Sequence, residues 1–297
     1  MRILYRTMMK RLCSDRLIRL GAVLALLLGI FIALSSGLIT GFTELYVQDF
    51  NFYLGESFMA ALLAFSLGRE FSDGTVRNKI IAGYTKTQFY LAAMLCAATV
   101  AVIYFLLTAG VFALSLIPEY RRLSVQPVAE AFLCIFLSNL FSAVTAAAVC
   151  NLTRNQLAGV LCTFGAIFGL YMLGEITDQA DGGQSYYTEN VYDAQGMPVL
   201  APNGKPLVIQ KTKFYYKEPL HSVLMVMHHG NPITTMGTLS CVFQDSHGWT
   251  DAETEKNRSE LDNYALEKIH PRYPVTIPVI ILIPALGLLA FRKKAIS

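Results

Sequence analysis

Few side chains in this sequence have the types and spacing that catalysis needs. The 297-residue chain contains no G-x-x-x-x-G-K-[ST] phosphate loop, no H-E-x-x-H zinc motif and no G-x-S-x-G nucleophile elbow. A membrane-embedded enzyme would need paired carboxylates, a Ser/His pair or a metal set at membrane depth, and Glu56 has no such companion. We therefore predict that the chain has no catalytic residue and binds no cofactor of its own.

Glu56 is the one acidic or basic side chain well inside a long apolar run. Placing a charge in lipid is costly, so this carboxyl group should face the protein interior or water, or be protonated. One interpretation puts Glu56 on a substrate path or a dimer interface. The other gives it a structural hydrogen bond, or a position near the outer headgroups.

Histidine and methionine gather in one stretch near the carboxyl-terminal third of the chain. Both residue types bind copper or zinc, but a methionine stripe is also typical of ordinary helix packing. We predict no metal site there. The residues concerned are His221, Met225, Met227, His228, His229 and Met236.

A compact elbow, residues 69–87, follows the apolar run that contains Glu56. Asp73 and Gly74 should break the preceding helix, and Thr75 can cap the next one. Residues 76–82 then form a short amphipathic helix that Gly83 ends, before a new helix starts near Thr87. A short helix of this kind suits a groove on a partner protein, and the plainer alternative is a polar connector.

The elements that carry these residues are long apolar runs. The composition is 54% hydrophobic and 15% charged, against roughly 25% charged in an ordinary soluble domain. About 20 helical residues cross a bilayer, and such segments must be helices because lipid offers backbone groups no partner. We predict an all-α membrane protein with six transmembrane helices, over residues 20–40, 52–68, 89–118, 131–151, 156–174 and 274–291.

The distribution of Lys and Arg sets the predicted orientation. Fourteen of these residues fall before the first run, after the second and fourth, and after the last, whereas the opposite short loops hold only Arg121 and Arg122. The positive-inside rule then places both termini in the cytoplasm and residues 175–273 outside the cell membrane. This outer segment is acidic, so the overall charge of +3 gives no reason to expect nucleic acid as a partner.

Four parts follow from these patterns. Residues 1–19 alternate basic and apolar side chains and are expected to form an amphipathic helix on the inner membrane surface, where anionic lipid attracts it. Residues 20–174 hold spans one to five and the elbow, and residues 274–297 hold span six and a basic tail. Residues 175–273 form the extracellular insertion, with a small β-hairpin or a three-stranded piece over 185–217 and helices over 219–241 and 251–269.

The stretch Glu70 to Lys86, E-F-S-D-G-T-V-R-N-K-I-I-A-G-Y-T-K, resembles the E-x-x-x-G-T-x-[RK]-N-x-[IL]-x-x-G-x-[ST] pattern of type-2 ABC transporter permeases. The resemblance implies a permease dimer, homomeric or mixed, that forms the translocation path, driven by separate ATPase subunits that bind ATP and Mg. It implies export of a peptide, drug or lipid. The elbow would then be the coupling helix that docks on the ATPase, through Glu70, Gly74, Thr75, Arg77, Asn78, Lys79 and Gly83.

A different function shares most of these features. A membrane sensor or assembly protein could bind a ligand with the extracellular insertion and a partner with the elbow. The long insertion departs from the minimal pattern of the permeases, in which two short re-entrant helices suffice.

Overall fold

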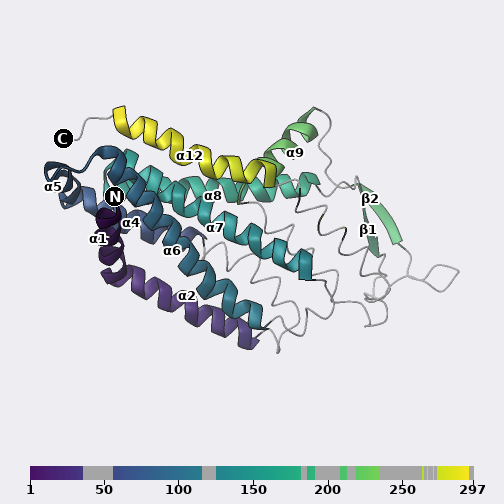
Figure 1. The fold of residues 1–297 in the computed structure, drawn as a ribbon. Helices are drawn as coiled ribbons and strands as arrows, with labels where there is room; N and C mark the ends of the chain where they lie inside the picture. Colours follow the sequence, from purple (N-terminus) through teal and green to yellow (C-terminus); the bar gives the residue numbers. More distant parts are fainter. Residues whose placement is uncertain are drawn as a thin grey trace.

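The computed structural model describes residues 1–35, 56–115, 125–181, 186–190, 208–212, 219–233, 263, 266, 270 and 273–293, and it is mostly helical (Figure 1). The predicted helical class is therefore confirmed. The described helices are α1 (Arg2–Ser14), α2 (Arg16–Ser35), α4 (Met59–Ser72), α5 (Thr75–Ile81), α6 (Lys86–Ser115), α7 (Val125–Thr153), α8 (Gln156–Asp181), α9 (Leu220–Gly230) and α12 (Tyr273–Lys293).

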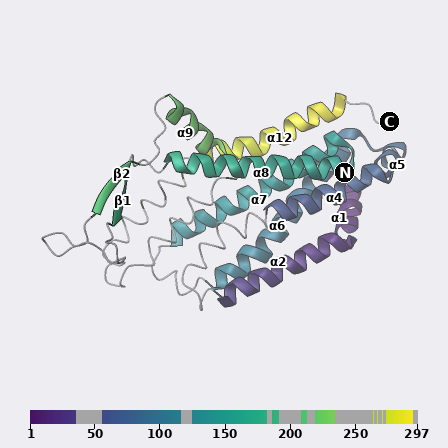
Figure 2. The ribbon, with the colours of Figure 1, turned by 180° about the vertical axis from the view of Figure 1, so that it is seen from behind.

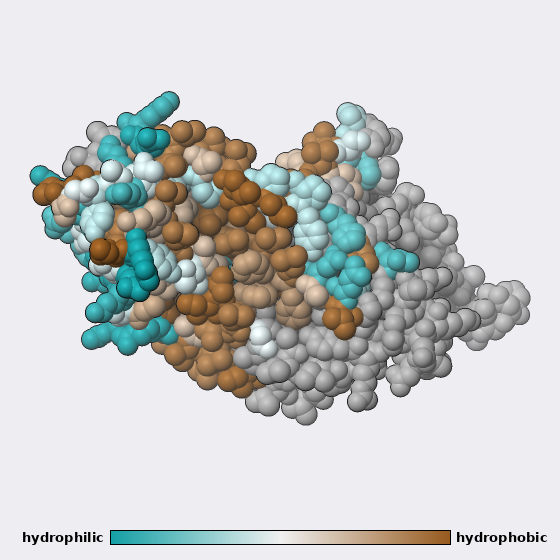
Figure 3. All heavy atoms as spheres, in the orientation of Figure 1, coloured by the Kyte–Doolittle hydropathy of each residue, from teal (hydrophilic) through white to brown (hydrophobic). Residues whose placement is uncertain are grey.

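Four of these helices are long and apolar enough to cross a membrane. They are Lys86–Leu107 within α6, Val125–Thr153, Gln156–Gly174 within α8, and Tyr273–Lys293. Figure 3 shows an apolar band over the middle of the helices and polar residues at the end that carries α1 and α5. The other two expected spans correspond to α2 and α4, and parts of both runs lie outside the described residues. The count of six spans therefore stays a prediction.

The long helices lie side by side, with α4 at the centre of the bundle. It contacts α2, α6, α7 and α8. Small side chains let the helices approach closely. Inside a lipid bilayer no hydrophobic effect brings helices together, and close packing of this kind holds them instead. The views from both sides place α1, α5 and the last turn of α12 at one end and the paired strands at the other (Figures 1 and 2). The buried alanines of this core are Ala25, Ala60, Ala64, Ala92, Ala93, Ala97, Ala101, Ala143, Ala146, Ala147 and Ala148.

A corner at Asp15 divides the amino-terminal segment. Its backbone is extended, with φ −67° and ψ 126°, and its Oδ1 accepts a hydrogen bond of 2.9 Å from the backbone N–H of Leu17. This is the bond by which an aspartate caps the start of a helix. The prediction of one interfacial helix over residues 1–19 is therefore wrong, because the cap ends α1 at Ser14 and starts α2 at Arg16.

The connection between α7 and α8 is as tight as the sequence indicates. Arg154 adopts the left-handed conformation with φ 55°. The Oδ1 of Asn155 accepts a hydrogen bond of 3.0 Å from the backbone N–H of Ala158, which caps the start of α8. These two residues reverse the chain and make the two helices antiparallel neighbours.

The region between α8 and α12 is described in pieces. Strand β1 (Tyr186–Asn190) pairs with β2 (Val208–Thr212) in antiparallel register, with Tyr186 opposite Thr212. Helix α9 ends at Gly230, short of the predicted 241, and Asn231 then donates a hydrogen bond of 2.7 Å to the carbonyl of Leu170 on α8. The predicted helix over 251–269 falls almost entirely outside the described residues.

Gly68 offers a test of the central packing, because α4 crosses the start of α8 there. A Cβ at this position would lie 2.8 Å from the Cα of Gln156, which is too close for two non-bonded carbon atoms. We expect Gly68→Ala to reduce stability by about 1–3 kcal/mol through overpacking. The measurement is thermal unfolding of the purified protein in detergent.

Gly110→Ala is the matched control, since a Cβ on Gly110 of α6 would meet nothing within 4 Å. An alanine in a helix interior is intrinsically favourable relative to glycine, so this variant should be neutral or stabilised. Equal melting temperatures for the two variants would show that α4 and α8 do not approach as closely as described.

Candidate functional site

The elbow is built from two glycines in the left-handed conformation. Helix α4 ends at Ser72, and Gly74, with φ 67°, donates from its backbone N–H to the carbonyl of Phe71 at 3.1 Å. Helix α5 then starts at Thr75. The expectation that Thr75 caps α5 is wrong. Gly74 holds the capping position without a side-chain bond, and the Thr75 hydroxyl accepts from Arg11 instead.

The far end of α5 closes with a paired hydrogen-bond motif around Gly83. The backbone N–H of Gly83 donates to the carbonyl of Ile80 at 3.0 Å, and that of Tyr84 donates to the carbonyl of Lys79 at 3.2 Å. This pattern requires a left-handed residue, and Gly83 supplies it with φ 97°. Seven residues are thus held as a separate short helix between α4 and α6.

The Glu70 carboxylate is the most buried charge at this end of the described bundle, with 5% of its side chain exposed. The Nζ of Lys79, 13% exposed, donates to its Oε2 at 2.5 Å. The same ammonium lies 5.3 Å from the ring centre of Phe89 on α6. A buried carboxylate needs such partners, because an uncompensated charge away from water is strongly unfavourable. Glu70 therefore fixes α5 against α4 and α6.

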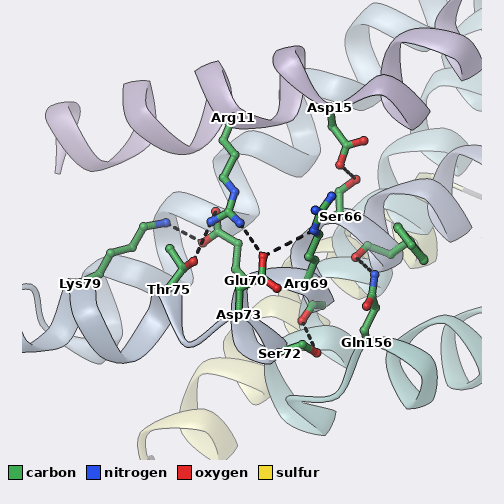
Figure 4. Close-up of polar contacts among 12 residues, drawn as sticks. Arg11, Asp15, Ser66, Arg69, Glu70, Ser72, Asp73, Thr75, Lys79 and Gln156 are labelled. Atoms are coloured by element: carbon green, nitrogen blue, oxygen red, sulfur yellow. Dashed lines mark hydrogen bonds and ion pairs between the residues drawn. The ribbon is translucent and has the colours of Figure 1, made fainter.

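Arg11 joins the amino-terminal helix to the elbow (Figure 4). Its guanidinium donates to the Thr75 hydroxyl at 2.8 Å and to the carboxylate of Asp73 at 3.0 Å, and it lies 3.8 Å from Glu70. Arg69 lies 3.4 Å from the same Asp73 carboxylate. The fork of donors on one arginine suits several oxygens at once. Helices α1, α4 and α5 are thereby connected through a single side chain.

Aromatic rings pack beneath the elbow. The ring centres of Phe71 and Phe89 lie 5.8 Å apart, and Phe291 of α12 lies 6.4 Å from Phe71. The guanidinium of Arg154, in the turn between α7 and α8, lies 5.3 Å from the Phe291 ring centre. Burial lowers the pKa of this arginine below its ordinary value. These contacts pack α4, α6 and α12 against one another beside the elbow.

One face of α5 packs inward and the other is exposed. Val76 is buried, whereas Arg77, Asn78 and Gly83 are exposed and the apolar side chain of Ile81 is 74% exposed. An exposed isoleucine beside an arginine and an amide is a plausible composition for a small contact surface on another protein. We call Arg77, Asn78 and Ile81 the α5 tip.

The structure divides the predicted elbow residues into two groups. Glu70, Gly74, Thr75, Lys79 and Gly83 build and anchor the helix, and Arg77 and Asn78 lie on its exposed side. Sequence reasoning missed Arg11. Its neighbours Lys10 and Arg16 have the same charge, so nothing in the local pattern distinguishes the residue that reaches the elbow.

Glu56 lies apart from this site, inside the bundle. It is fully buried in a π-helical turn that precedes α4, beside the hydroxyl groups of Ser138 and Ser142 on α7. π-helical turns inside helices occur often at functional sites. Its proposed roles on a substrate path or dimer interface remain proposals.

The His and Met stretch lies partly on α9. His221, Met225 and Met227 belong to that helix, and Met236 is outside the described residues. Within the described ranges no three His, Cys, Asp or Glu side chains group together as metal ligands would.

In comparisons with known proteins, no family model and no curated protein sequence matches this chain.

The burial of Glu70 leads to a prediction about stability. Glu70→Gln leaves the Lys79 ammonium without its carboxylate in a mostly buried place, and breaking such a pair costs about 3 kcal/mol or more. Asp73→Asn is the matched control, because Asp73 is 44% exposed and an exposed ion pair contributes about 1 kcal/mol or less. Thermal unfolding in detergent measures both.

The double variant Glu70→Gln, Lys79→Met removes both charges and should recover part of the loss, since an apolar replacement of a buried pair is often tolerated. If Glu70→Gln and Asp73→Asn have the same melting temperature, the buried ion pair does not anchor the elbow.

Proposed function

We propose that this chain is the permease subunit of an ATP-binding-cassette transporter, driven by separate cytoplasmic ATPase subunits. The observation that carries the proposal is the α5 tip, the exposed face of a short helix that the buried Glu70–Lys79 ion pair holds at the end of a membrane-suited bundle. The sequence resemblance over Glu70 to Lys86 falls on the same helix. In this proposal the chain needs no catalytic residues of its own, because the ATPase subunits would bind ATP and Mg and hydrolyse the ATP.

Orientation follows in this proposal from the basic residues. The bundle end that carries α1, α5 and the end of α12 also carries Arg2, Arg6, Lys10, Arg69 and Arg77, so it faces the cytoplasm. Helices α2 and α4 would complete six spans. Residues 175–273, including the β1–β2 pair and α9, would lie outside the cell and cover the exit.

The contacts of α5 suggest how an ATPase would move the membrane helices. A push on the α5 tip reaches α4 through Glu70, α6 through Lys79 and Phe89, and α1 through Arg11. Since α1 leads into α2 at the Asp15 corner, both sides of the bundle respond together. A second permease subunit would complete the translocation path, with Glu56 facing it or the dimer interface, for export of a peptide, drug or lipid.

Site-specific photo-crosslinking in native membranes tests the docking surface. A photo-reactive amino acid at position 81 should form a crosslink to a protein that contains a P-loop, identified by mass spectrometry. The control position is 161, on the outward apolar face of α8, where Leu161 is 62% exposed. It should crosslink to lipid or membrane protein and to no ATPase.

The pair Arg77→Glu and Ile81→Asp should then lower permease-stimulated ATP hydrolysis, by about tenfold if the tip is an interface hot spot. A sensor or assembly protein would instead crosslink at position 81 to a partner without a P-loop. That result, or unchanged ATP hydrolysis in both variants, would overturn the permease proposal.

A further inference from the structure

A pocket of about 640 Å³ lies in the corner between α1, α2 and α4. It lies at the polar end of the bundle, next to the apolar band (Figure 3). This size is within the range of small-molecule sites. Its lining residues are Arg11, Leu12, Ser14, Asp15, Arg16, Leu17, Ser66, Arg69 and Glu70.

The acidic side chains of the pocket are already occupied. Asp15 accepts from the hydroxyl of Ser66 at 2.9 Å with Oδ2 and from the backbone of Leu17 with Oδ1 (Figure 4). Glu70 is paired with Lys79 and Arg11 through its two oxygens. Each oxygen of these two carboxylates thus already has a partner within the protein.

Two arginines keep donors available. Arg69 uses Nε toward Asp73, and its terminal amino groups have no partner within the described part of the chain. Arg16 is exposed and has no ion pair among the described residues. The charged residues that line the pocket are the three arginines Arg11, Arg16 and Arg69 and the two acids Asp15 and Glu70, so one formal positive charge remains. A phosphodiester carries one negative charge, and arginine binds its oxygens in a fork geometry.

An apolar stripe leads away from the pocket along α2. Leu17, in the pocket wall, is followed at helical spacing by Leu20, Leu24 and Leu27, which are 56%, 37% and 55% exposed. Ten residues of helix span about 15 Å, which is about half of a 30 Å hydrocarbon core, or one leaflet. The stripe is therefore as long as one leaflet and starts at the pocket, so one lipid molecule would place its anionic group in the pocket and its acyl chain on the stripe.

We propose that this corner binds an anionic phospholipid from the leaflet on the α1 side, with its phosphodiester between Arg16 and Arg69 and an acyl chain along Leu17, Leu20, Leu24 and Leu27. A headgroup without an added cation, such as phosphatidylglycerol, matches the single remaining positive charge. The bound lipid would stabilise the junction of α1, α2 and α4. This site is independent of the proposed transport function, because it needs no ATPase and no substrate.

Native mass spectrometry of the full chain in neutral detergent tests the site. Dioctanoyl phosphatidylglycerol should bind with one tight site. Arg16→Gln and Arg69→Gln should each weaken it about tenfold, the effect of losing a charge-assisted bond of roughly 1.5 kcal/mol. Arg6→Gln removes an exposed arginine of α1 outside the pocket and should change nothing. Lipid-free melting temperatures establish that each variant is folded, and Arg16→Gln avoids the elbow ion pairs altogether.

Three comparisons identify the ligand. Dioctanoyl phosphatidylcholine should bind more weakly, and equal binding would overturn the charge match. Glycerophosphoglycerol and inorganic phosphate lack acyl chains and should not compete at millimolar concentration. If they compete fully, the pocket takes a soluble phosphate and the lipid proposal fails. An equal loss in Arg6→Gln and Arg16→Gln would indicate diffuse attraction to the basic surface, which also overturns the proposal.

Discussion

The arrangement of the bundle end that carries α1 and α5 depends on the burial of one carboxylate, Glu70. A charge that is 5% exposed must be compensated, and the partners come from outside its own helix: Lys79 from α5 and Arg11 from α1. The same constraint sets the position of α5, because the left-handed Gly74 between the two helices turns the chain so that Lys79 of α5 reaches Glu70 of α4. The α5 tip, with Ile81, is exposed because the opposite face of α5 packs inward against α4 through the Glu70–Lys79 pair.

Helix α4 connects two different environments. Glu70 near its end meets several cations, whereas Glu56 before its start is enclosed by α7, with Ser138 and Ser142 as neighbours. Fourteen residues of helix separate the two acids by about 20 Å. A central helix with a polar group at each end is suited to carry displacement from the α5 tip into the bundle, because its close contact with α8 at Gly68 leaves little room for bending.

The corner at Asp15 divides the amino-terminal segment into two helices that make different contacts. Helix α1 lies against α6 and supplies Arg11 to the elbow, and α2 continues as an apolar helix with an exposed leucine stripe. Their junction is polar on the α4 side and apolar along α2, as a site for a phospholipid must be. The proposed lipid and the proposed ATPase would contact different parts of one ion-pair network, the lipid at Arg69 and the ATPase beyond Lys79.

The sequence by itself determined the features that depend only on residues close together in the chain and on the surrounding water or lipid. Charge-free runs predict long helices because lipid leaves the backbone no other partner, and four of them have membrane-crossing length in the structure. Gly74 and Gly83 set the limits of α5, since few other residues tolerate a positive φ. Only the tertiary structure decided which of several equivalent basic residues reaches Glu70 and that Thr75 binds Arg11 instead of capping α5. Those outcomes depend on contacts between residues more than fifty positions apart in the chain, which local spacing does not encode.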